Sequence, residues 1–186
     1  MNTKKTPLII IPGLGDWTSA YALVAIYWKL LGYDVHIFSF EWDNRAEDFD
    51  TAFHRLLHFI DKYHMSSVNI IGSSAGGTAA INALTSRPRI VNKVVTVATP
   101  YTHLSHLTNT KLKVSLDRLE HARLTTFETR ILSIHGLHDQ TVPVIKSQPR
   151  GVETQKIFVV RHIVIIALAL TIYSRYIRHF FNKEAV

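Results

Sequence analysis

Apolar, β-branched runs recur along the 186-residue chain, and each is continuous rather than alternating with polar residues. Continuous apolar runs are typical of strands that are covered on both faces, as in a parallel sheet. Most of the runs end in small or turn-forming residues, and the last ends in Arg-His. The predicted strands are 8–11, 35–40, 68–71, 94–98, 131–134 and 157–160.

Segments with helical character separate these strands. In the second of them, Phe53, Leu56, Leu57 and Ile60 fall on one face at helical spacing. Alternating strands and helices predict an α/β fold, a three-layer sandwich in which a mostly parallel sheet of about six strands has helices on both faces. The predicted helices are 19–31, 46–64, 75–86 and 163–182.

The chain has the length of one domain, and 1–186 is predicted to be a single unit. One connection, 101–129, is long for a link between neighbouring elements. Within it, Leu112, Leu116 and Leu119 predict a short amphipathic helix. Long connections often carry function, so 101–129 is expected to shape a substrate pocket.

Composition narrows the class of protein. With 47% hydrophobic and 19% charged residues the chain is globular, and the absence of cysteine removes disulfides and thiolate metal sites. The formal net charge of +7 could attract nucleic acid, but Lys and Arg are scattered and no nucleic-acid motif is found. No nucleic-acid partner is therefore expected.

Two apolar segments bear on membranes and location. The run 8–11 is shorter than the roughly 7 to 15 apolar residues of a secretion signal. The uncharged segment 163–174, "IVIIALALTIYS", is shorter than the roughly 20 residues of a spanning helix, and Arg175 and Arg178 follow it. A helix buried against the sheet and a cytoplasmic protein are expected. Contact of the basic C-terminal helix with a membrane surface is the alternative.

The stretch "GSSAG", 72–76, has the form G-x-S-x-G between an apolar strand and a helix. In this motif the serine sits on a sharp, strained turn, and glycines two positions away on either side let chain segments approach closely. Ser74 is therefore the candidate nucleophile, and Ser73 occupies the variable position. The competing interpretation is an ordinary serine at a helix N-cap.

A serine hydroxyl needs a base, normally an imidazole that a carboxylate holds in place. In this strand–turn–helix architecture the partners follow in the order serine, acid, histidine. "HGLHDQTVP" places Asp139 after the strand 131–134, and "FVVRHIVII" places His162 at the end of the last strand. The predicted order is Ser74, Asp139, His162.

Each assignment has a competitor. Asp139 could be a turn aspartate. A metal site on one flank of the helix 46–64 would use His54, His58 and Asp61, but no distant ligand is apparent, so no metal is expected. The histidines that compete with His162 are His103, His106, His135 and His138, all of which precede Asp139.

Together, "IPGLGDW" after the first strand, "GSSAGG", "HGLHDQTVP" and the histidine after the last strand resemble the α/β-hydrolase superfamily over nearly the whole chain. The likeness is to compact, lidless members such as small bacterial lipases and small serine hydrolases. It implies that Ser74 attacks a carbonyl, His162 relays the proton and Asp139 orients the ring, with no cofactor. The implied oxyanion donors are the backbone N–H groups of Leu14 and Ala75.

The chain departs from many relatives at two places. It has Pro12-Gly13 where they often carry His-Gly, and Arg161 where they often carry glycine. The first departure leaves a backbone donor in place, because an N–H group does not depend on the side chain.

The resemblance implies a hydrolase of carboxylic esters, with a small-molecule or lipid-like acyl ester as substrate. A thioesterase, amidase or acyltransferase would use the same three residues, and a binding protein could keep the fold without the chemistry. The oligomeric state stays open. The residues expected to line an acyl pocket are Leu104, Leu107, Leu112 and Leu116.

Overall fold

The computed structural model describes residues 7–63 and 65–183. Their centre is one sheet of six strands in the order β2-β1-β3-β4-β5-β6, and every neighbouring pair is parallel. The predicted α/β class and strand number are therefore confirmed. The strands are β1 (Pro7–Ile11), β2 (Asp34–Ile37), β3 (Val68–Ser73), β4 (Val91–Val97), β5 (Ile131–His135) and β6 (Glu153–Lys156).

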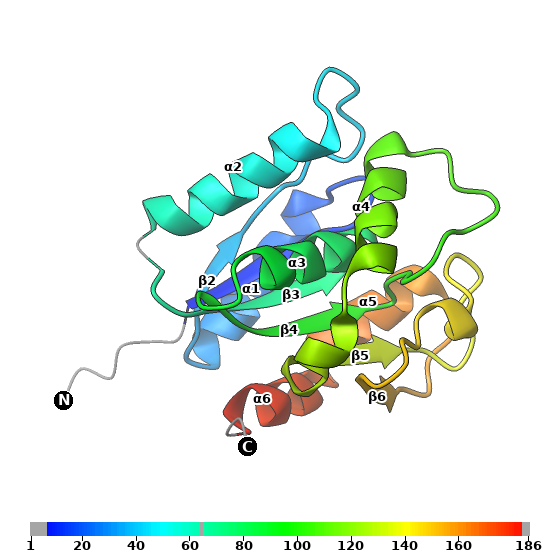
Figure 1. Cartoon of the computed structure of the whole chain (residues 1–186). Coiled ribbons are helices and arrows are strands. Elements are labelled where there is room, and N and C mark those ends of the chain that lie inside the picture. The colour runs from blue at the N-terminus through cyan, green and yellow to red at the C-terminus, as the bar shows by residue number, and fades with distance from the viewer. Residues whose placement is uncertain (1–6, 64, 184–186) are drawn as a thin grey trace.

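Helices cover both faces of the sheet. In Figure 1, α2, α3 and α4 lie in front of it and α1 and α5 behind it. The two groups pack on separate hydrophobic cores, the first with Ile9 and Ile70 and the second, with α6, on Leu8 and Ile71. The helices are α1 (Thr18–Leu30), α2 (Phe49–Lys62), α3 (Ala75–Ser86), α4 (Thr110–His121), α5 (His162–Leu170) and α6 (Ser174–Asn182), with short 3-10 helices at Leu124–Arg130 and Val144–Lys146.

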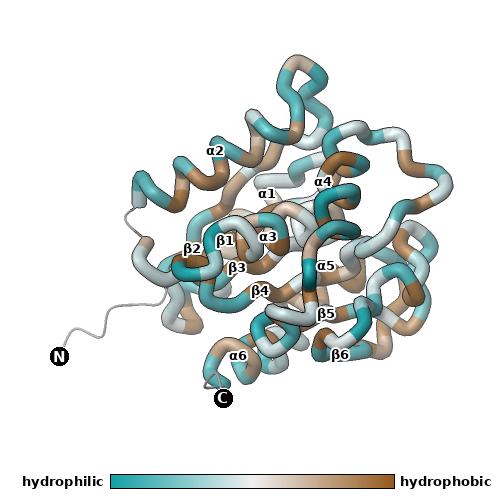
Figure 2. Tube along the Cα trace, in the orientation of Figure 1, coloured by the Kyte–Doolittle hydropathy of each residue, from teal (hydrophilic) through white to brown (hydrophobic). Residues whose placement is uncertain are grey.

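Amphipathic spacing explains α2. Brown and teal alternate along its turns in Figure 2, and Phe53, Leu56 and Ile60 are buried as predicted. Its N-cap, Asp48, accepts a hydrogen bond from the N–H of Thr51. The predicted end of this helix, His64, lies outside the described residues.

The connection 101–129 contains the predicted helix, α4, and the leucines of this helix belong to a hydrophobic core. Leu112, Leu116 and Leu119 are buried in the core between α4 and its neighbours α2 and α3. The Ser115 hydroxyl donates to Thr78 Oγ1 at 2.7 Å, which ties α4 to α3. Both leucines help to close the core, and their expected place in an acyl pocket stays a prediction.

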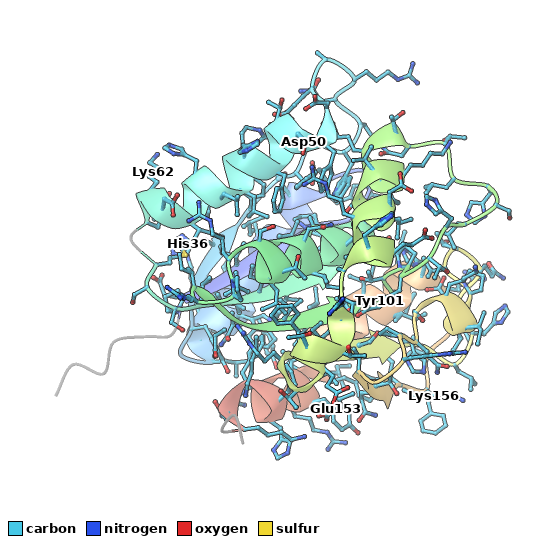
Figure 3. The ribbon with its side chains drawn as sticks, viewed as in Figure 1. His36, Asp50, Lys62, Tyr101, Glu153 and Lys156 are labelled. Atoms are coloured by element: carbon cyan, nitrogen blue, oxygen red, sulfur yellow. The ribbon has the colours of Figure 1, made fainter. Side chains whose placement is uncertain are left out.

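The sixth strand lies four residues earlier than the predicted run 157–160. β6 (Glu153–Lys156) is a mostly exposed edge strand, and Glu153 and Lys156 mark its ends in Figure 3. The apolar run that follows is a loop in which Ile157 and Val159 are buried in the core with α5. Apolar character predicted the burial of Ile157 and Val159 but not the exposure of Phe158 and Val160, nor that the sheet strand would be the polar segment before them, since an edge strand needs few apolar residues.

The predicted helix 163–182 is two helices, α5 and α6, bent by 54°. Side chains of α1 bind the backbone at the break. Trp28 Nε1 donates to the carbonyl of Leu170 at 2.9 Å, and the Tyr27 hydroxyl donates to the carbonyl of Thr171 at 3.1 Å. Within the described part of the chain no single helix could cross a membrane; only this bent pair has the combined length and apolar character to do so.

The burial of Leu116 predicts a large effect on stability. Leu116→Ala should lower the free energy of unfolding by about 2 to 5 kcal/mol, because it opens a cavity in a closed core. Leu23→Ala is the matched control, because Leu23 is 72% exposed, and it should change stability by less than about 0.5 kcal/mol. Urea unfolding of the two variants measures the difference, and equal losses would contradict the packing.

Candidate active site

Ser74 occupies a strained turn between β3 and α3. Its φ of 51° and ψ of −123° lie in a region that non-glycine residues rarely adopt. The Ser74 N–H donates to the carbonyl of Val97 on β4 at 2.8 Å, and the Ser74 carbonyl accepts from the N–H of Gly77 at 3.0 Å. Backbone strain of this kind costs on the order of 1 to 3 kcal/mol and persists only where the surroundings impose it.

Glycines make the turn possible. A Cβ atom on Gly76 would lie 2.1 Å from the carbonyl oxygen of Ile11, and one on Gly72 would lie 2.4 Å from the carbonyl oxygen of Gly76. A Cβ on Gly13 would lie 2.8 Å from Ser74 Cβ, so the loop after β1 passes directly beside the candidate nucleophile. Backbone packs on backbone at Gly72 and Gly76, where no side-chain movement could relieve a clash.

The two adjacent serines have different environments. The Ser73 side chain is fully buried, and its hydroxyl has no hydrogen-bond partner within the described residues. Ser74 retains 9% exposure. Of the pair, only Ser74 has a surface that a substrate could reach.

Asp139 and His162 form the hydrogen-bonded pair that the sequence order predicts. Asp139 Oδ2 lies 2.7 Å from His162 Nδ1, and Asp139 Oδ1 accepts from the N–H groups of Thr141 and Val142 at 2.9 and 3.0 Å. Burial favours a higher pKa for the Asp139 carboxyl, but the hydrogen bonds from His162, Val142 and Thr141 outweigh it and the pKa is lowered. The carboxylate is therefore ionised at neutral pH.

The sequence predicted His162 at the end of a strand. In the structure it is the first residue of α5. Arg161 before it has a φ of 75°, so this departure from the usual glycine stands at a position with left-handed backbone. The His162 side chain is 14% exposed. With Nδ1 on the carboxylate, Nε2 is the nitrogen available to a substrate or nucleophile.

The three predicted residues stand at one edge of the sheet. Register pairs Ser73 with Val97 on β4 and Val97 with Ile134 on β5, so Ser74 and the loops that follow β5 and β6 all lie at the carboxyl ends of the strands. This edge is where ligands bind in open α/β sheets. No hydrogen bond of Ser74 Oγ is found within the described residues, so its contact with His162 stays a prediction; such bonds often form only with substrate.

The predicted oxyanion donors occupy different settings. Ala75 is buried and is the first residue of α3, so its N–H precedes the hydrogen bonds inside the helix. Leu14 is 45% exposed, in a turn that the N–H of Asp16 closes on the carbonyl of Gly13 at 3.2 Å. Their joint use as donors stays a prediction.

Asp16 is a residue at this edge that the sequence did not single out. Its Oδ2 accepts from the Ser39 hydroxyl at 2.7 Å and from the Glu41 N–H at 2.6 Å, which ties the loop after β1 to the loop after β2. Its Oδ1 is buried and has no partner among the described residues. The acid is visible in "IPGLGDW", but its partners come from another loop and have no local signal.

Two of the four competing histidines, His135 and His103, have partners elsewhere, and the other two, His106 and His138, are exposed. His135 is 3% exposed, its Nε2 lies 2.9 Å from Gln148 Nε2, and burial lowers its pKa. His103 Nε2 lies 2.8 Å from Asp117 Oδ1. Within the described residues, His103, Asp117 and Glu120 are the group that could hold a metal ion, and all three ligand atoms lie near the surface of α4. This group is distinct from His54, His58 and Asp61.

Comparisons with known proteins agree on the fold. No family model and no curated protein sequence matches the chain. The structure is similar to an α/β hydrolase enzyme from the metagenome of Mar Chica lagoon sediments, with 19% identity, a TM-score of 0.65 and coverage of 96% and 91% of the two chains. It is also similar to a monoacylglycerol lipase of Paleococcus ferrophilus, with 12% identity, a TM-score of 0.68 and coverage of 85% and 88%.

A third similar structure is Rv0554 from Mycobacterium tuberculosis, with 13% identity, a TM-score of 0.73 and coverage of 99% of this chain and 93% of the other. The likeness extends over nearly the whole chain in each comparison except that with the lipase. The chain therefore has the α/β-hydrolase fold, as the motifs around Ser74 and Asp139 had suggested.

The close contacts of Gly76 predict that the fold does not tolerate a methyl group at this position. Gly76→Ala should lower the melting temperature sharply or prevent folding, because the methyl group would meet backbone atoms of β1. Gly32→Ala is the control: its Cβ would meet nothing within 4 Å, so only the strain of its φ of 96°, about 1 to 2 kcal/mol, should be lost. Thermal unfolding compares the two, and a Gly76→Ala protein as stable as the control would refute the close packing.

The lowered pKa of Asp139 predicts a pH-dependent contribution to stability. A carboxyl whose pKa falls on folding stabilises the protein above its unfolded pKa of about 3.9, and this stabilisation disappears as pH falls through the folded pKa. The gap in unfolding free energy between wild type and Asp139→Asn should therefore have its full size at pH 6 and should shrink below about pH 4. Urea unfolding at several pH values measures it, and a gap that does not change with pH would contradict the prediction.

Proposed function

We propose that the protein is a serine hydrolase that cleaves carboxylic esters through an acyl-enzyme intermediate. The observation that carries the proposal is the strained, partly accessible Ser74 at the same sheet edge as the hydrogen-bonded Asp139–His162 pair. A serine becomes nucleophilic at neutral pH when an imidazole that a carboxylate holds in place can take its proton.

In the proposed mechanism His162 Nε2 takes the proton of Ser74 as its oxygen attacks the ester carbonyl. Asp139 holds the neutral tautomer of the ring through Nδ1 and stabilises the imidazolium that forms. The N–H groups of Ala75 and Leu14 would stabilise the oxyanion, and loss of one such donor costs about 3 kcal/mol in other hydrolases. His162 gives the proton to the leaving alcohol as the ester bond breaks. Water then attacks the acyl-enzyme while His162 takes one of its protons, and that proton passes to Ser74 Oγ as the carboxylic acid leaves.

Similar structures support a hydrolase, since they include an α/β hydrolase enzyme and a monoacylglycerol lipase. At 12 to 19% identity they support the fold and leave the substrate to be tested. A small-molecule or lipid-like acyl ester is the proposed substrate. Leu104, which is partly exposed in the connection before α4, remains a candidate for the acyl site.

The proposal predicts different effects at the two adjacent serines. Ser74→Ala should lower kcat for p-nitrophenyl butyrate by about 10⁴-fold to 10⁶-fold, because the nucleophile is lost. Ser73→Ala, whose side chain is buried, should retain activity within about tenfold while both proteins stay folded. A fluorophosphonate probe should label wild type and Ser73→Ala but not Ser74→Ala.

Other acyl-transfer activities and a binding role are separated by two measurements. Initial rates with matched oxygen esters, thioesters and amides identify the preferred bond, and a preference for either of the last two would replace the ester proposal. Turnover that is equal in wild type and Ser74→Ala, together with no labelling, would indicate a protein that keeps the fold without the chemistry.

A further inference from the structure

Helix α1 exposes an apolar stripe to solvent. Leu23, Ile26 and Leu30 are 72%, 57% and 82% exposed and recur at helical spacing. They lie opposite the buried residues Tyr21 and Trp28, which pack on the sheet. A surface helix of a soluble domain normally presents polar residues on this side, so the stripe requires an explanation.

Helix α5 extends the stripe into a face. α1 and α5 lie side by side, joined by the hydrogen bond from Trp28 Nε1 to the Leu170 carbonyl and by that from the Tyr27 hydroxyl to the Thr171 carbonyl. Ile163, Val164 and Ile172, in and just after α5, are 55%, 41% and 70% exposed. The outer surface of these two helices is therefore largely apolar.

The side-chain charges carried by α1, α5 and α6 are of one sign. α1, α5 and α6 contain no Asp or Glu. Within the described residues, no ion pair involves Lys29, Arg161, Arg175 or Arg178, which are exposed on or beside these helices, whereas Lys183 just after α6 pairs with Glu153 at 3.0 Å. Acidic residues concentrate instead in 41–61 and on α4, which belong to the other side of the sheet. We call the surface formed by α1, α5 and α6 the apolar-basic face.

The apolar-basic face continues to the candidate active site. α1 follows β1 and α5 follows the loop after β6, so both helices begin at the sheet edge that carries Ser74. His162 is the first residue of α5. The loops at this edge also expose large apolar side chains, at 45 to 81%: Leu14, Trp17, Leu137, Phe158 and Val160.

We propose that the apolar-basic face binds the surface of an anionic lipid bilayer and brings the mouth of the site to acyl esters held in that bilayer, the second part resting on the proposed hydrolase function. Apolar side chains with adjacent unpaired cations, on helices that carry no acid, match the chemistry of an anionic membrane interface, where apolar groups enter the acyl boundary and cations stay with the headgroups. The net charge of +7 acts in the same direction.

A second copy of the chain is a poorer partner for this face. A two-fold contact places the same patch against itself. The cations of Lys29, Arg175 and Arg178 on one copy would then oppose those on the other, with no acid on these helices to pair with them. Charge complementarity therefore favours anionic lipid over self-association.

Vesicle flotation with the full chain tests the binding. Wild type should float with vesicles of phosphatidylcholine containing phosphatidylglycerol, and less with phosphatidylcholine alone. Leu23→Ser with Ile26→Ser should weaken the partition coefficient at least about tenfold, because each side chain leaves the lipid. Ile145→Ser is the matched control, since Ile145 is 77% exposed. The carbonyl of the next residue, Lys146, accepts from the N–H of Tyr101, whose side chain belongs to the core on the opposite side of the sheet from α1 and α5.

A second pair of variants tests the charges. Arg175→Gln with Arg178→Gln should reduce flotation with anionic vesicles several-fold, and so should salt at about 1 M, where charges interact over only about 3 Å. Arg89→Gln with Lys113→Gln removes the same charge from the α3–β4 loop and α4, and should bind like wild type. Equal melting temperatures confirm that all these surface variants are folded.

Ser74→Ala separates lipid binding from hydrolysis, because it should float like wild type even without turnover. The proposal is overturned if wild type stays unbound, or if the variants of the apolar-basic face bind as wild type does. It is also overturned if ultracentrifugation shows a dimer that Leu23→Ser with Ile26→Ser dissociates, since the face would then bind a second copy. Floating protein without esterase activity would support the binding and contradict only the proposed hydrolase function.

Discussion

The contact between the first turn of α3 and the end of β1 controls the geometry of the whole sheet edge. Gly76 lies so close to the Ile11 carbonyl that a methyl group would reach within 2.1 Å of its oxygen. This approach brings α3 onto the sheet at the angle that gives Ser74 its left-handed backbone. The strain at Ser74 is therefore maintained by backbone packing, and the side chain of the serine stays free of structural hydrogen bonds among the described residues.

The partners of Ser74 are positioned by a different mechanism. Asp139 is held by two backbone N–H groups of its own loop, and it in turn holds His162 at the beginning of α5. α5 itself ends where Trp28 and Tyr27 of α1 bind the carbonyls at the break. α1 thus anchors the helix that carries the histidine, although α1 contributes no side chain to the pair.

The two faces of the sheet differ in what they do with their outer surfaces. α2 and α4 bury their apolar residues and expose acids and bases that pair with one another, as Arg118 does with Asp50. α1 and α5 bury one set of apolar residues and expose another. The same helices that anchor the candidate catalytic pair therefore form the surface for which a lipid partner is proposed.

The sequence predicted those features whose residues lie close together in the chain. Continuous apolar runs predicted the parallel sheet with helices on both faces, because strands that are buried on both faces need apolar residues at every position. The Gly-x-Ser-x-Gly turn was recognisable because its signal lies within five residues. The order of Ser74, Asp139 and His162 likewise identified an acid and a base that do pair.

Only the tertiary structure decided features made by distant segments: β6 became the polar edge strand before the apolar run, and the C-terminal helix broke where α1 binds its carbonyls. Asp16 joined two loops, and the leucines of α4 closed the core. Side-chain contacts between segments far apart in the chain leave no local pattern, and they determined which exposed apolar residues gather on one face.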